Sequence, residues 1–506
     1  MDLLDQKIIS CFPGKVVRKD LTAFMKRGAN VPTFVLEYLL GMYCATDNEG
    51  AIQAGIEKIK RILAENYVRP DESEVVKSKI RENGEYTIID KLEVFLDEKE
   101  DIYVAQFTNL KIKPFEIGTE YILQHSKLLS GGVWSIVKLG YLPALEQDEE
   151  SEEDIFDSRQ TKSKKTKYDS PFTILSLQPI QMPNLDIQQI IAARKHFSKE
   201  EWISLLLRSE GYEPDHLTLK QQFHYLLRLV PLIQNNYNLV ELGPRGTGKS
   251  HVFQELSPYS ILMSGGQTTV SNLFYNMASR KVGLVGHWDC IAFDEVAGIK
   301  FRDLDGIQIL KNYMANGSFA RGQNTINADA SICFVGNTND TVSNMVRYSH
   351  LFSPFPEEFR DDSAFFDRIH YYLPGWETPK LRNDLITKKY GLISDCMSEF
   401  CRQMRKYDFN DTIDSYFELN RNFNKRDDIA VRKTVSGLMK LIYPDGQASQ
   451  AELRELLEYA IEGRRRVKEQ LRVMAGAEFA DTELGYIDIS TGEHRIVMLP
   501  EYGGRR

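Results

Sequence analysis

The sequence predicts a multidomain α/β protein. The chain has 506 residues, too many for one hydrophobic core, so about three or four domains are expected. The apolar segment "YNLVELG" runs into a glycine-rich turn and then into a helix-compatible segment, an order typical of α/β folds. Nearer the N-terminus, helical apolar spacing gives way to alternation with period two. This change predicts a separate α+β module.

The N-terminal module is predicted to span residues 1–145. Apolar residues three and four apart in "VPTFVLEYLLGMY" and "AIQAGIEKIKRILAENY" predict helices. From residue 86 to residue 143, "EYTIIDKLEVFLDEKEDIYVAQFTNLKIKPFEI" and "GGVWSIVKLGYLP" alternate between apolar and polar residues. That pattern predicts the strands of a small β-barrel or sheet that follows the helices.

A charged segment separates this module from the rest of the chain. The residues "EQDEESEEDIFDSRQTKSKKTK" place an acidic block before a basic one with almost no apolar content. Such a segment cannot build a core, so 146–170 is predicted to be a linker. The stretches "SKEEWISLLLRSEGY" and "LKQQFHYLLRLVPLIQ" then predict a helical connector over 171–235.

The glycine-rich turn matches the phosphate-binding motif GxxxxGK[ST]. Its glycines let backbone N–H groups point inward around a phosphate, and the start of the following helix adds a positive end. Lys249 is expected to reach the β- and γ-phosphates of ATP, and Ser250 to ligate Mg²⁺. The predicted nucleotide-binding residues are Gly243, Pro244, Arg245, Gly246, Thr247, Gly248, Lys249 and Ser250.

A second strand supplies the acids that ATP hydrolysis needs. "HWDCIAFDEVAG" is an apolar run that ends in Asp294 and Glu295. Alone, two acids at a strand end are common, but these follow the phosphate loop by some forty residues. Asp294 is therefore predicted to organise Mg²⁺, and Glu295 to polarise the attacking water.

Composition narrows the class of partners and the compartment. The 63 basic and 72 acidic residues give a net charge of -9, so no global basic field attracts nucleic acid, and any DNA contact must be local. The six cysteines are scattered and show neither a disulfide framework nor zinc-ligand spacing. There is no signal peptide and no run of about eighteen apolar residues. We expect a cytoplasmic protein with no membrane contact.

The order of the later motifs resembles that of AAA+ ATPases. "ASICFVGNTND" resembles the sensor-1 strand, in which an uncharged polar residue orients the attacking water. Asn339 fits the strand-end spacing best, and Asn337 is the second choice. "RDDIAVRKTVSGLMKLIYP" resembles the lid helix that carries a sensor-2 arginine, which would be Arg432, with Arg426 as the weaker alternative.

An arginine finger is also implied by this resemblance. "DDSAFFDRIHYYLPGW" resembles the AAA+ segment that carries it, and Arg368 is the candidate. In that fold the finger acts on the ATP of a neighbouring subunit, so the resemblance implies a ring. The alternative is that Arg368 pairs with Asp367 or another carboxylate. The resemblance divides the remaining chain into an AAA+ P-loop ATPase core over 236–375, a helical lid over 376–475 and a tail over 476–506.

More particular segments resemble the BrxL family, the Lon-like AAA+ proteins of bacterial BREX phage-defence systems. They are "FDEVAGIKF", "LKNYMANGSFARGQ", "FVGNTND", "FFDRIHYYLPGWE" and "VRKTVSGLMKLIYP". The resemblance covers nearly the whole chain and implies a DNA-binding ring similar to the replicative MCM helicases. A hexamer or stacked hexamers are expected, with other defence-system proteins as possible partners. Lon-type proteolysis needs a serine–lysine dyad on a further domain, and the sequence stops at "HRIVMLPEYGGRR", so no peptidase activity is expected.

Three segments carry basic residues that could contact DNA phosphates. "GSFARGQNTINADAS" predicts a hairpin where MCM-like ATPases insert a pore loop, although its turn lacks lysine, so a structural hairpin at a subunit interface is an equal alternative. "SRKVGLVGHW" is a second pore candidate, and an amphipathic helix of the N-terminal module is the third. The candidates are Arg321, Lys311, Arg280, Lys281, Lys58, Lys60 and Arg61.

The predicted function is that of a ring-forming AAA+ ATPase with ATP and Mg²⁺ as cofactors. It would bind duplex DNA without sequence preference and couple ATP to assembly or movement on DNA during anti-phage defence. One alternative is an ATP-driven protein unfoldase of Lon-like type, for which "GLVGHW" offers a loose match to an aromatic pore loop. Another is a clamp whose ATPase serves assembly alone.

Overall fold

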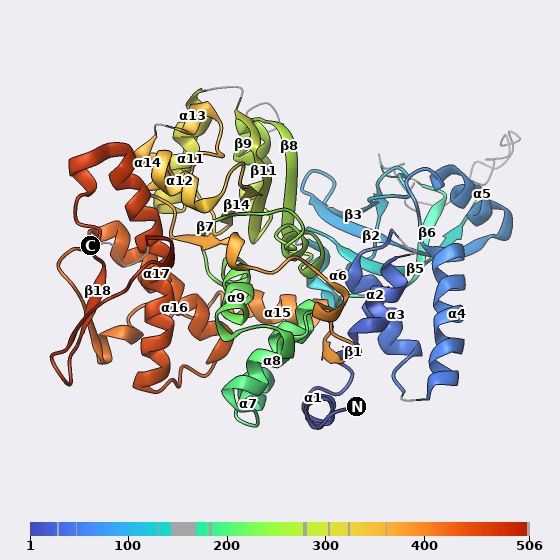
Figure 1. Cartoon of the computed structure of the whole chain (residues 1–506). Helices are drawn as coiled ribbons and strands as arrows, with labels where there is room; N and C mark the ends of the chain where they lie inside the picture. The colour runs from blue at the N-terminus through green and yellow to red at the C-terminus, as the bar shows by residue number, and fades with distance from the viewer. Residues whose placement is uncertain are drawn as a thin grey trace, which may run out of the picture. The chain divides into compact units, whose positions relative to one another are not determined.

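The structure is a computed structural model, and it describes residues 1–27, 30–46, 48–129, 131–142, 168, 170–181, 185–276, 281–301, 304–321, 324–360 and 362–502. The chain forms two compact units (Figure 1). One comprises Met1–Phe34 and Leu185–Arg506, and the other comprises Val35–Asn184. Both contain helices and strands, so the predicted multidomain α/β class is confirmed. None of the helices in the described ranges is long and apolar enough to cross a lipid bilayer.

The unit Val35–Asn184 combines helices with a five-stranded antiparallel sheet in the order β4-β3-β2-β5-β6. The predicted alternation is visible in β5, where Val133, Ser135, Val137 and Leu139 are buried. The edge strands of the described sheet are β4 and β6, so its closure into a barrel stays a prediction. The elements are α3 (Thr33–Tyr43), α4 (Glu49–Asn66), α5 (Ser73–Asn83), β2 (Glu85–Asp97), β3 (Ile102–Phe107), β4 (Phe115–Glu116), α6 (Thr119–Gln124), β5 (Val133–Tyr141) and β6 (Phe172–Pro179).

The other unit is built on a five-stranded parallel sheet in the order β15-β7-β14-β11-β8. Every residue of β7 is buried, as expected for a parallel strand covered on both faces. Because the strands are parallel, the carboxyl ends of β7, β14 and β11 lie at one edge, where polar residues meet. The strands are β7 (Asn238–Gly243), β8 (Ser260–Thr268), β11 (Cys290–Phe301), β14 (Ser331–Asn337) and β15 (Tyr371–Pro374).

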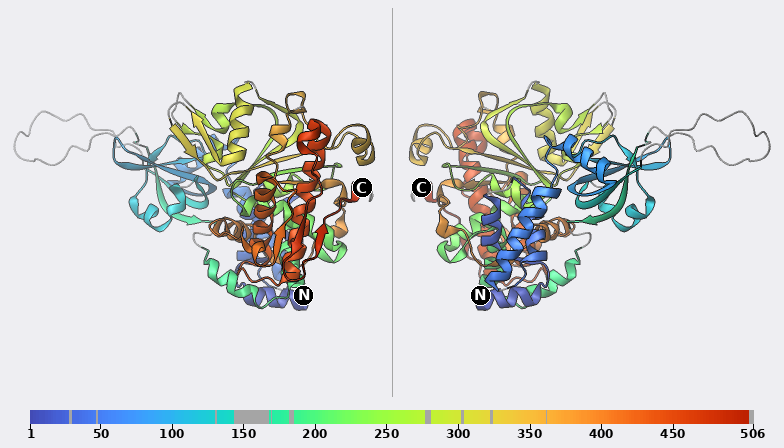
Figure 2. Two further views of the ribbon diagram at one scale, coloured as in Figure 1. Left: turned by 90° about the vertical axis from the view of Figure 1, so that its left-hand side faces the viewer. Right: turned by 90° about the vertical axis from the view of Figure 1, so that its right-hand side faces the viewer.

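Helices before β7 and after β15 pack on this core. The helices α16 and α17 lie side by side (Figure 1 and the left view of Figure 2), and α9 packs against α16. Residues 376–475 contain α15, α16 and α17 together with the short strands β16 (Tyr390–Leu392) and β17 (Phe417–Leu419), and the helical lid stays a prediction. Before β7 come α2 (Lys19–Lys26), α7 (Ile187–Arg194), α8 (Lys199–Glu210) and α9 (Leu219–Ile233), and after β15 come α15 (Ser394–Met404), α16 (Lys425–Ile442) and α17 (Gln450–Ala475). Between the two strands lie α10 (Val270–Leu273), α11 (Leu304–Asn316), α12 (Val342–Tyr348), α13 (Glu357–Arg360) and α14 (Ser363–Phe366).

The two units divide the chain differently from the predicted boundaries at the N-terminus. Residues 1–34 belong with the parallel sheet, because β1 (Val16–Arg18) pairs antiparallel with β16 (Tyr390–Leu392). In addition, the carboxylate of Asp5 in α1 (Leu3–Cys11) lies 3.4 Å from the guanidinium of Arg208 in α8. These contacts join segments far apart in the sequence, and local periodicity carries no information about such pairs.

Two further boundaries also differ. β6 was predicted to be part of the helical connector, but it pairs with β5 and completes the N-terminal sheet. The predicted tail contains β18 (Gly485–Asp488) and β19 (His494–Ile496), which form a three-stranded sheet with β17 (Phe417–Leu419). Apart from Tyr168 and Ser170, the predicted charged linker 146–170 lies outside the described residues.

Candidate nucleotide-binding site

The glycine-rich loop begins where β7 ends, and the structure shows why glycines stand there. Gly246 and Gly248 have φ angles of 82° and 77°, in the left-handed region that favours glycine. Gly243 packs against the backbone of Gly375, so that a Cβ on Gly243 would lie 2.4 Å from the Gly375 carbonyl carbon. The backbone amide of Leu381 donates to the Gly246 carbonyl at 2.8 Å. The loop is therefore held in shape by its own chain.

Lys249 lies folded over this loop. Its Nζ donates to the carbonyl oxygens of Gly243 at 3.2 Å and Pro244 at 2.7 Å, and it lies 3.4 Å from Oδ1 of Asn337. Burial lowers the pKa of Lys249, and the nearby carboxylates of Glu241 and Asp294 oppose that shift. A cation held among carbonyl oxygens at the end of a parallel sheet is placed to receive phosphate oxygens.

The helix predicted after the loop is shorter than expected. After Ser250 the chain forms one short π-helix, Val252–Leu256, which ends before Pro258. Ser257 is extended at φ -124° and ψ 128°, as favoured for a residue that precedes proline. The loop and its lysine thus rest on a single helical turn of a type that is frequent at functional sites.

The acid pair lies at a break in β11. The register between β11 and β8 shifts between Asp294 and Ile299, and Glu295 in this bulge has a φ of 52°. Oδ1 of Asp294 accepts a hydrogen bond from the Glu295 amide at 2.9 Å. Asp294 is half-buried and Glu295 is exposed. A glutamate in the left-handed region costs about 1–2 kcal/mol, and such strain concentrates at active sites.

Of the two asparagines proposed as sensor 1, the structure brings Asn337 to the loop. Asn337 ends β14, is paired in register with Gly243 and lies beside the ammonium of Lys249. Asn339, the first choice, stands exposed two residues beyond the strand end. Which of the two asparagines acts as sensor 1 stays a prediction.

The residues of this edge fit the predicted cofactors by their chemistry. The hydroxyl of Ser250 and the carboxylate of Asp294 are oxygen ligands of the kind that Mg²⁺ prefers. Asp294 is close enough to Lys249 to affect its pKa, so the acid and the phosphate-binding cation share one site. Bound ATP and Mg²⁺ would supply the phosphoryl group and the charge that stabilises its transfer.

Arg368 lies at the opposite end of the sheet from the loop. Its carbonyl oxygen accepts a hydrogen bond from Nδ2 of Asn238 at 2.8 Å, and Asn238 is the first residue of β7, whereas Gly243 is the last. That strand length corresponds to about 17 Å at a rise of about 3.3 Å per residue. The guanidinium donates to the Ala364 carbonyl and pairs with no carboxylate among the described residues. The predicted alternative, a pair with Asp367, is therefore not what the structure shows.

The two sensor-2 candidates, Arg432 and Arg426, both pair with carboxylates away from the phosphate loop. Arg432 makes two parallel hydrogen bonds of 2.8 Å to Asp414 and one of 2.5 Å to Asp428, and these partners raise its pKa. The next residue, Lys433, donates to the carbonyl of Asn236 just before β7. Arg432 thus stands near the start of β7, as Arg368 does, and Arg426 pairs with Asp367.

A buried ion pair under the loop was missed by the sequence reasoning. The guanidinium of Arg228 in α9 binds the carboxylate of Glu241 in β7 through two hydrogen bonds of 2.9 and 2.6 Å, and neither side chain is exposed. The same guanidinium donates to the carbonyl of Thr247 at 3.2 Å. The sequence does carry a sign of this pair, since Arg228 interrupts the apolar run "YLLRLVPLI" and Glu241 interrupts the apolar run "NLVELG".

The exposed face of α4 carries the basic residues predicted from the N-terminal helix. Lys58, Lys60 and Arg61 are all exposed. Nζ of Lys58 lies 4.3 Å from the ring centroid of Tyr43, and Lys60 pairs with Glu57 at 3.0 Å. This face offers positive charge to solvent and an aromatic ring beside it.

The pore candidates are described only in part. Lys311 pairs with Asp362 at 2.8 Å, so its charge is compensated within the chain. Arg280 lies outside the described residues, and the side chains of Lys281 and Arg321 are also not described. The predicted hairpin pairing is confirmed. Its strands are β12 (Ser318–Arg321) and β13 (Asn324–Asn327), and Lys281 begins β10 (Lys281–Val282).

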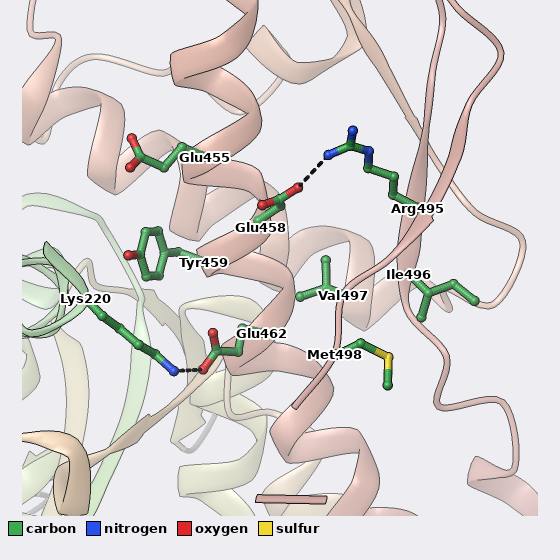
Figure 3. Close-up of a pocket in the computed structure, with 9 residues that line it drawn as sticks. All are labelled: Lys220, Glu455, Glu458, Tyr459, Glu462, Arg495, Ile496, Val497 and Met498. Atoms are coloured by element: carbon green, nitrogen blue, oxygen red, sulfur yellow. Dashed lines mark ion pairs between the residues drawn. The ribbon is translucent and has the colours of Figure 1, made fainter. Parts of the chain in front are cut away.

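A cleft of about 730 Å³ lies between α17, the start of α9 and β19 (Figure 3). Three glutamates of α17 face it, but Lys220 lies 3.3 Å from Glu462 and Arg495 lies 3.8 Å from Glu458. Its lining includes none of the predicted nucleotide-site residues. The cleft is therefore separate from the predicted phosphate site at the loop.

Comparison with known proteins places this geometry in a family. The family model described as "Lon-like protease BrxL-like, ATPase domain" matches residues 172–485, and the model "BREX system Lon protease-like protein BrxL N-terminal" matches residues 10–141. A "Lon-like protease BrxL" of Bacillus cereus (strain H3081.97) is 56% identical over 504 residues, which are 100% of this chain and 72% of the relative. A "Lon-like protease BrxL" of Escherichia coli O9:H4 (strain HS) is 53% identical over 501 residues, 99% of this chain and 69% of the relative.

The ATPase model spans the loop, the acid pair, both asparagines, the finger candidate Arg368 and the sensor-2 candidates Arg432 and Arg426. The description of this model names an ATPase domain, in agreement with a phosphate-binding loop followed by an acid pair on one sheet edge. With matches over most of the sequence and identities above 50% to relatives, the chain belongs to the BrxL family of Lon-like, BREX-associated proteins.

Proposed function

We propose that this chain is an ATP-hydrolysing subunit of a homo-oligomeric ring, a hexamer or stacked hexamers, that acts on duplex DNA in anti-phage defence. The observation that carries the proposal is the separation of Lys249 and Arg368 at opposite ends of β7. An arginine there cannot reach a nucleotide on its own loop. A second copy that presents its Arg368 end to the loop of the first would complete the site, and repetition of this head-to-tail contact closes a ring.

Within one subunit, the residues of the sheet edge divide the work of hydrolysis. Lys249 binds the phosphates, while Ser250 and Asp294 hold Mg²⁺. Glu295 accepts the proton of the attacking water, and Asn337 orients that water from β14. The roles fit the positions of these side chains: at the loop, at the end of β14, and at the break in β11 just after its pairing with β14. Phosphoryl transfer depends mainly on such positioning and on charge.

Mixing two inactive variants tests the shared site. Lys249→Ala removes phosphate binding but leaves Arg368, and Arg368→Ala removes the finger but leaves the loop. Each variant alone is expected to lose hydrolysis, since an arginine finger contributes about 10³- to 10⁵-fold to kcat. Rings assembled from a mixture of both should regain activity at the interfaces that combine an intact loop with an intact finger. Initial rates measured against the mixing ratio should therefore pass through a maximum.

The matched control is a mixture of Lys249→Ala with a double variant, Lys249→Ala/Arg368→Ala, which can build no complete interface. Its rate should stay at background at every ratio. If the mixture of the two single variants also stays at background while mixed particles form, the finger does not act between subunits and the proposal fails.

The DNA part of the proposal is supported by local rather than global charge. The net charge of -9 repels DNA at a distance, so the exposed cluster Lys58, Lys60 and Arg61 on α4 would act only at contact range. The aromatic ring beside Lys58 suits contact with a nucleic acid sugar or base. Contacts of this kind are sequence-tolerant and weaken steeply with salt.

A joint measurement of ATPase rate and particle size tests this part. Duplex DNA at low salt is expected to raise turnover or to favour larger particles, and both effects should vanish at high salt. The triple variant Lys58→Gln, Lys60→Gln and Arg61→Gln should reduce the response. The control is Lys77→Gln in α5, which removes a lysine that pairs with Glu74 at 2.7 Å and should leave the response unchanged. A full response in the triple variant would remove this face from the DNA site.

The second candidate function is a protein unfoldase, and the supporting observation is that the relatives are named "Lon-like protease BrxL". An unfolded protein such as casein would then stimulate hydrolysis and duplex DNA would not. The absence of peptidase activity from this polypeptide stays a prediction, and cleavage of the same casein measured in parallel checks it.

A further inference from the structure

The loop that carries Arg368 is held by one buried side chain of a distant helix. Arg464 of α17 is not exposed at all. Its Nη1 donates to the carbonyl oxygens of Asp367 at 3.0 Å and Ile369 at 2.5 Å, the residues on either side of Arg368. Its Nη2 donates to the carboxylate of Asp367 at 2.7 Å. Arg464 therefore binds the backbone of the finger loop on both sides of Arg368.

The same guanidinium also ties the two long helices together. Nε of Arg464 donates to Oδ1 of Asp427 in α16 at 2.8 Å, and the other oxygen of Asp427 accepts from Lys468 of α17 at 2.6 Å. Four of the five N–H donors of Arg464 are thus used, in a fixed fork that a lysine cannot reproduce. The finger loop, α16 and α17 form one connected unit through this residue.

The side chain of Arg368 itself contributes little to this network. It is half-buried, and its Nε is buried without a hydrogen-bond partner among the described residues. Its Nη1 donates to the Ala364 carbonyl. Burial lowers its pKa, and the neighbouring Arg426 adds to that shift. The backbone around Arg368 is thus held by strong hydrogen bonds, whereas its guanidinium forms no ion pair with a carboxylate in the part of the chain that the structure describes. Asp367 and Asp362 lie near enough to oppose the lowering of its pKa.

We propose that Arg464 is the positioning residue of the arginine finger: it sets the place of Arg368 and makes the finger follow any movement of α16 and α17. This inference rests on the proposed function, because it concerns the finger that one subunit presents to the next. A change in the helices of one copy would then alter hydrolysis in its neighbour, with no change in the neighbour's own loop.

The test uses Arg464→Lys, which keeps the buried positive charge but cannot bridge two carbonyls and two carboxylates at once. Rings of this variant alone are expected to bind ATP as the unchanged chain does and to hydrolyse it about 10²-fold more slowly, the usual effect of a displacement near 1 Å. Mixed with Lys249→Ala, the variant should regain activity, because its loop is intact and the partner supplies an intact finger. Mixed with Arg368→Ala it should not, because both members lack a correctly placed finger.

The matched control is Arg466→Lys. Arg466 is an equally buried arginine of α17, but it binds the carbonyl of Tyr372 and the carboxylates of Glu462 and Glu501 instead of the finger loop. It is expected to lose thermal stability to a similar degree as Arg464→Lys and to keep its turnover. A purely structural Arg464 would show rescue with neither partner, and that result overturns the inference, as does unchanged turnover of Arg464→Lys.

Failure of this inference and failure of the proposed function give different results. If Arg368→Ala and Lys249→Ala rescue each other while Arg464→Lys and Lys249→Ala do not, the finger acts between subunits but Arg464 does not position it. If the first pair shows no rescue, the shared site itself is wrong. Should Arg464→Lys fail to fold, Asp427→Asn weakens the same anchor from α16 and should show the same pattern of rescue.

Discussion

The Glu295→Gln variant is expected to bind ATP with nearly unchanged affinity and to hydrolyse it about 10²- to 10⁴-fold more slowly, the range typical of a lost general base. The amide has the size of the carboxylate but cannot accept a proton from water. No partner of the Glu295 carboxylate is found among the described residues, and the side chain is exposed, so the fold does not depend on its charge. Affinity by titration with a fluorescent ATP analogue and single-turnover hydrolysis separate the two effects.

Two comparisons make this result specific. Glu478→Gln changes an exposed glutamate beyond α17, outside the predicted site, and should leave both quantities unchanged. Lys249→Ala should lose affinity and turnover together, because it removes the cation that contacts the phosphates. Turnover of Glu295→Gln within tenfold of the unchanged chain would assign the base to another residue.

The nucleotide site was largely predictable because its parts are local. A strand, a turn and their polar residues are adjacent in the sequence, so Gly243–Ser250 and the pair Asp294 and Glu295 could be named from spacing alone, and the structure brings them to one sheet edge. The choice between Asn337 and Asn339 could not be made this way. It depends on the register of β14 against β7, which is a tertiary relation.

The partners of the predicted arginines were equally invisible to local reasoning. Arg432 lies on the predicted helix, but Asp414, which binds it, comes from a segment outside that helix. Arg464 was not considered, because a charged residue in a long polar helix such as α17 normally faces solvent. The packing of α17 against α16 and β15 buries it. The fold class could be predicted from the spacing of apolar residues, whereas the side-chain contacts between elements could be seen only in the structure.

Removal of either member of the Arg228–Glu241 pair is expected to destabilise the unit that contains the parallel sheet by about 3–5 kcal/mol, since it leaves a buried charge without a counter-charge. Arg228→Met and Glu241→Leu test this separately. A Trp134→Phe background removes the tryptophan of the other unit, so that the fluorescence of Trp202, Trp288 and Trp376 reports thermal unfolding of this one. Arg382→Met, which breaks an exposed pair with Asp384, is the control and should change stability by less than about 1 kcal/mol.

The double variant separates stability from function. Arg228→Met with Glu241→Leu leaves no lone charge, and apolar replacement of a buried pair is often neutral or stabilising, so the midpoint of unfolding should return close to that of the unchanged chain. ATP affinity should not return with it, because the double variant still lacks the hydrogen bond from Arg228 to the Thr247 carbonyl. That bond holds the backbone of the phosphate loop. If the unfolding midpoint and the ATP affinity both recover, the pair serves packing alone. Recovery of stability alone would show that the chain keeps a buried charge pair in order to hold the loop on which Lys249 stands.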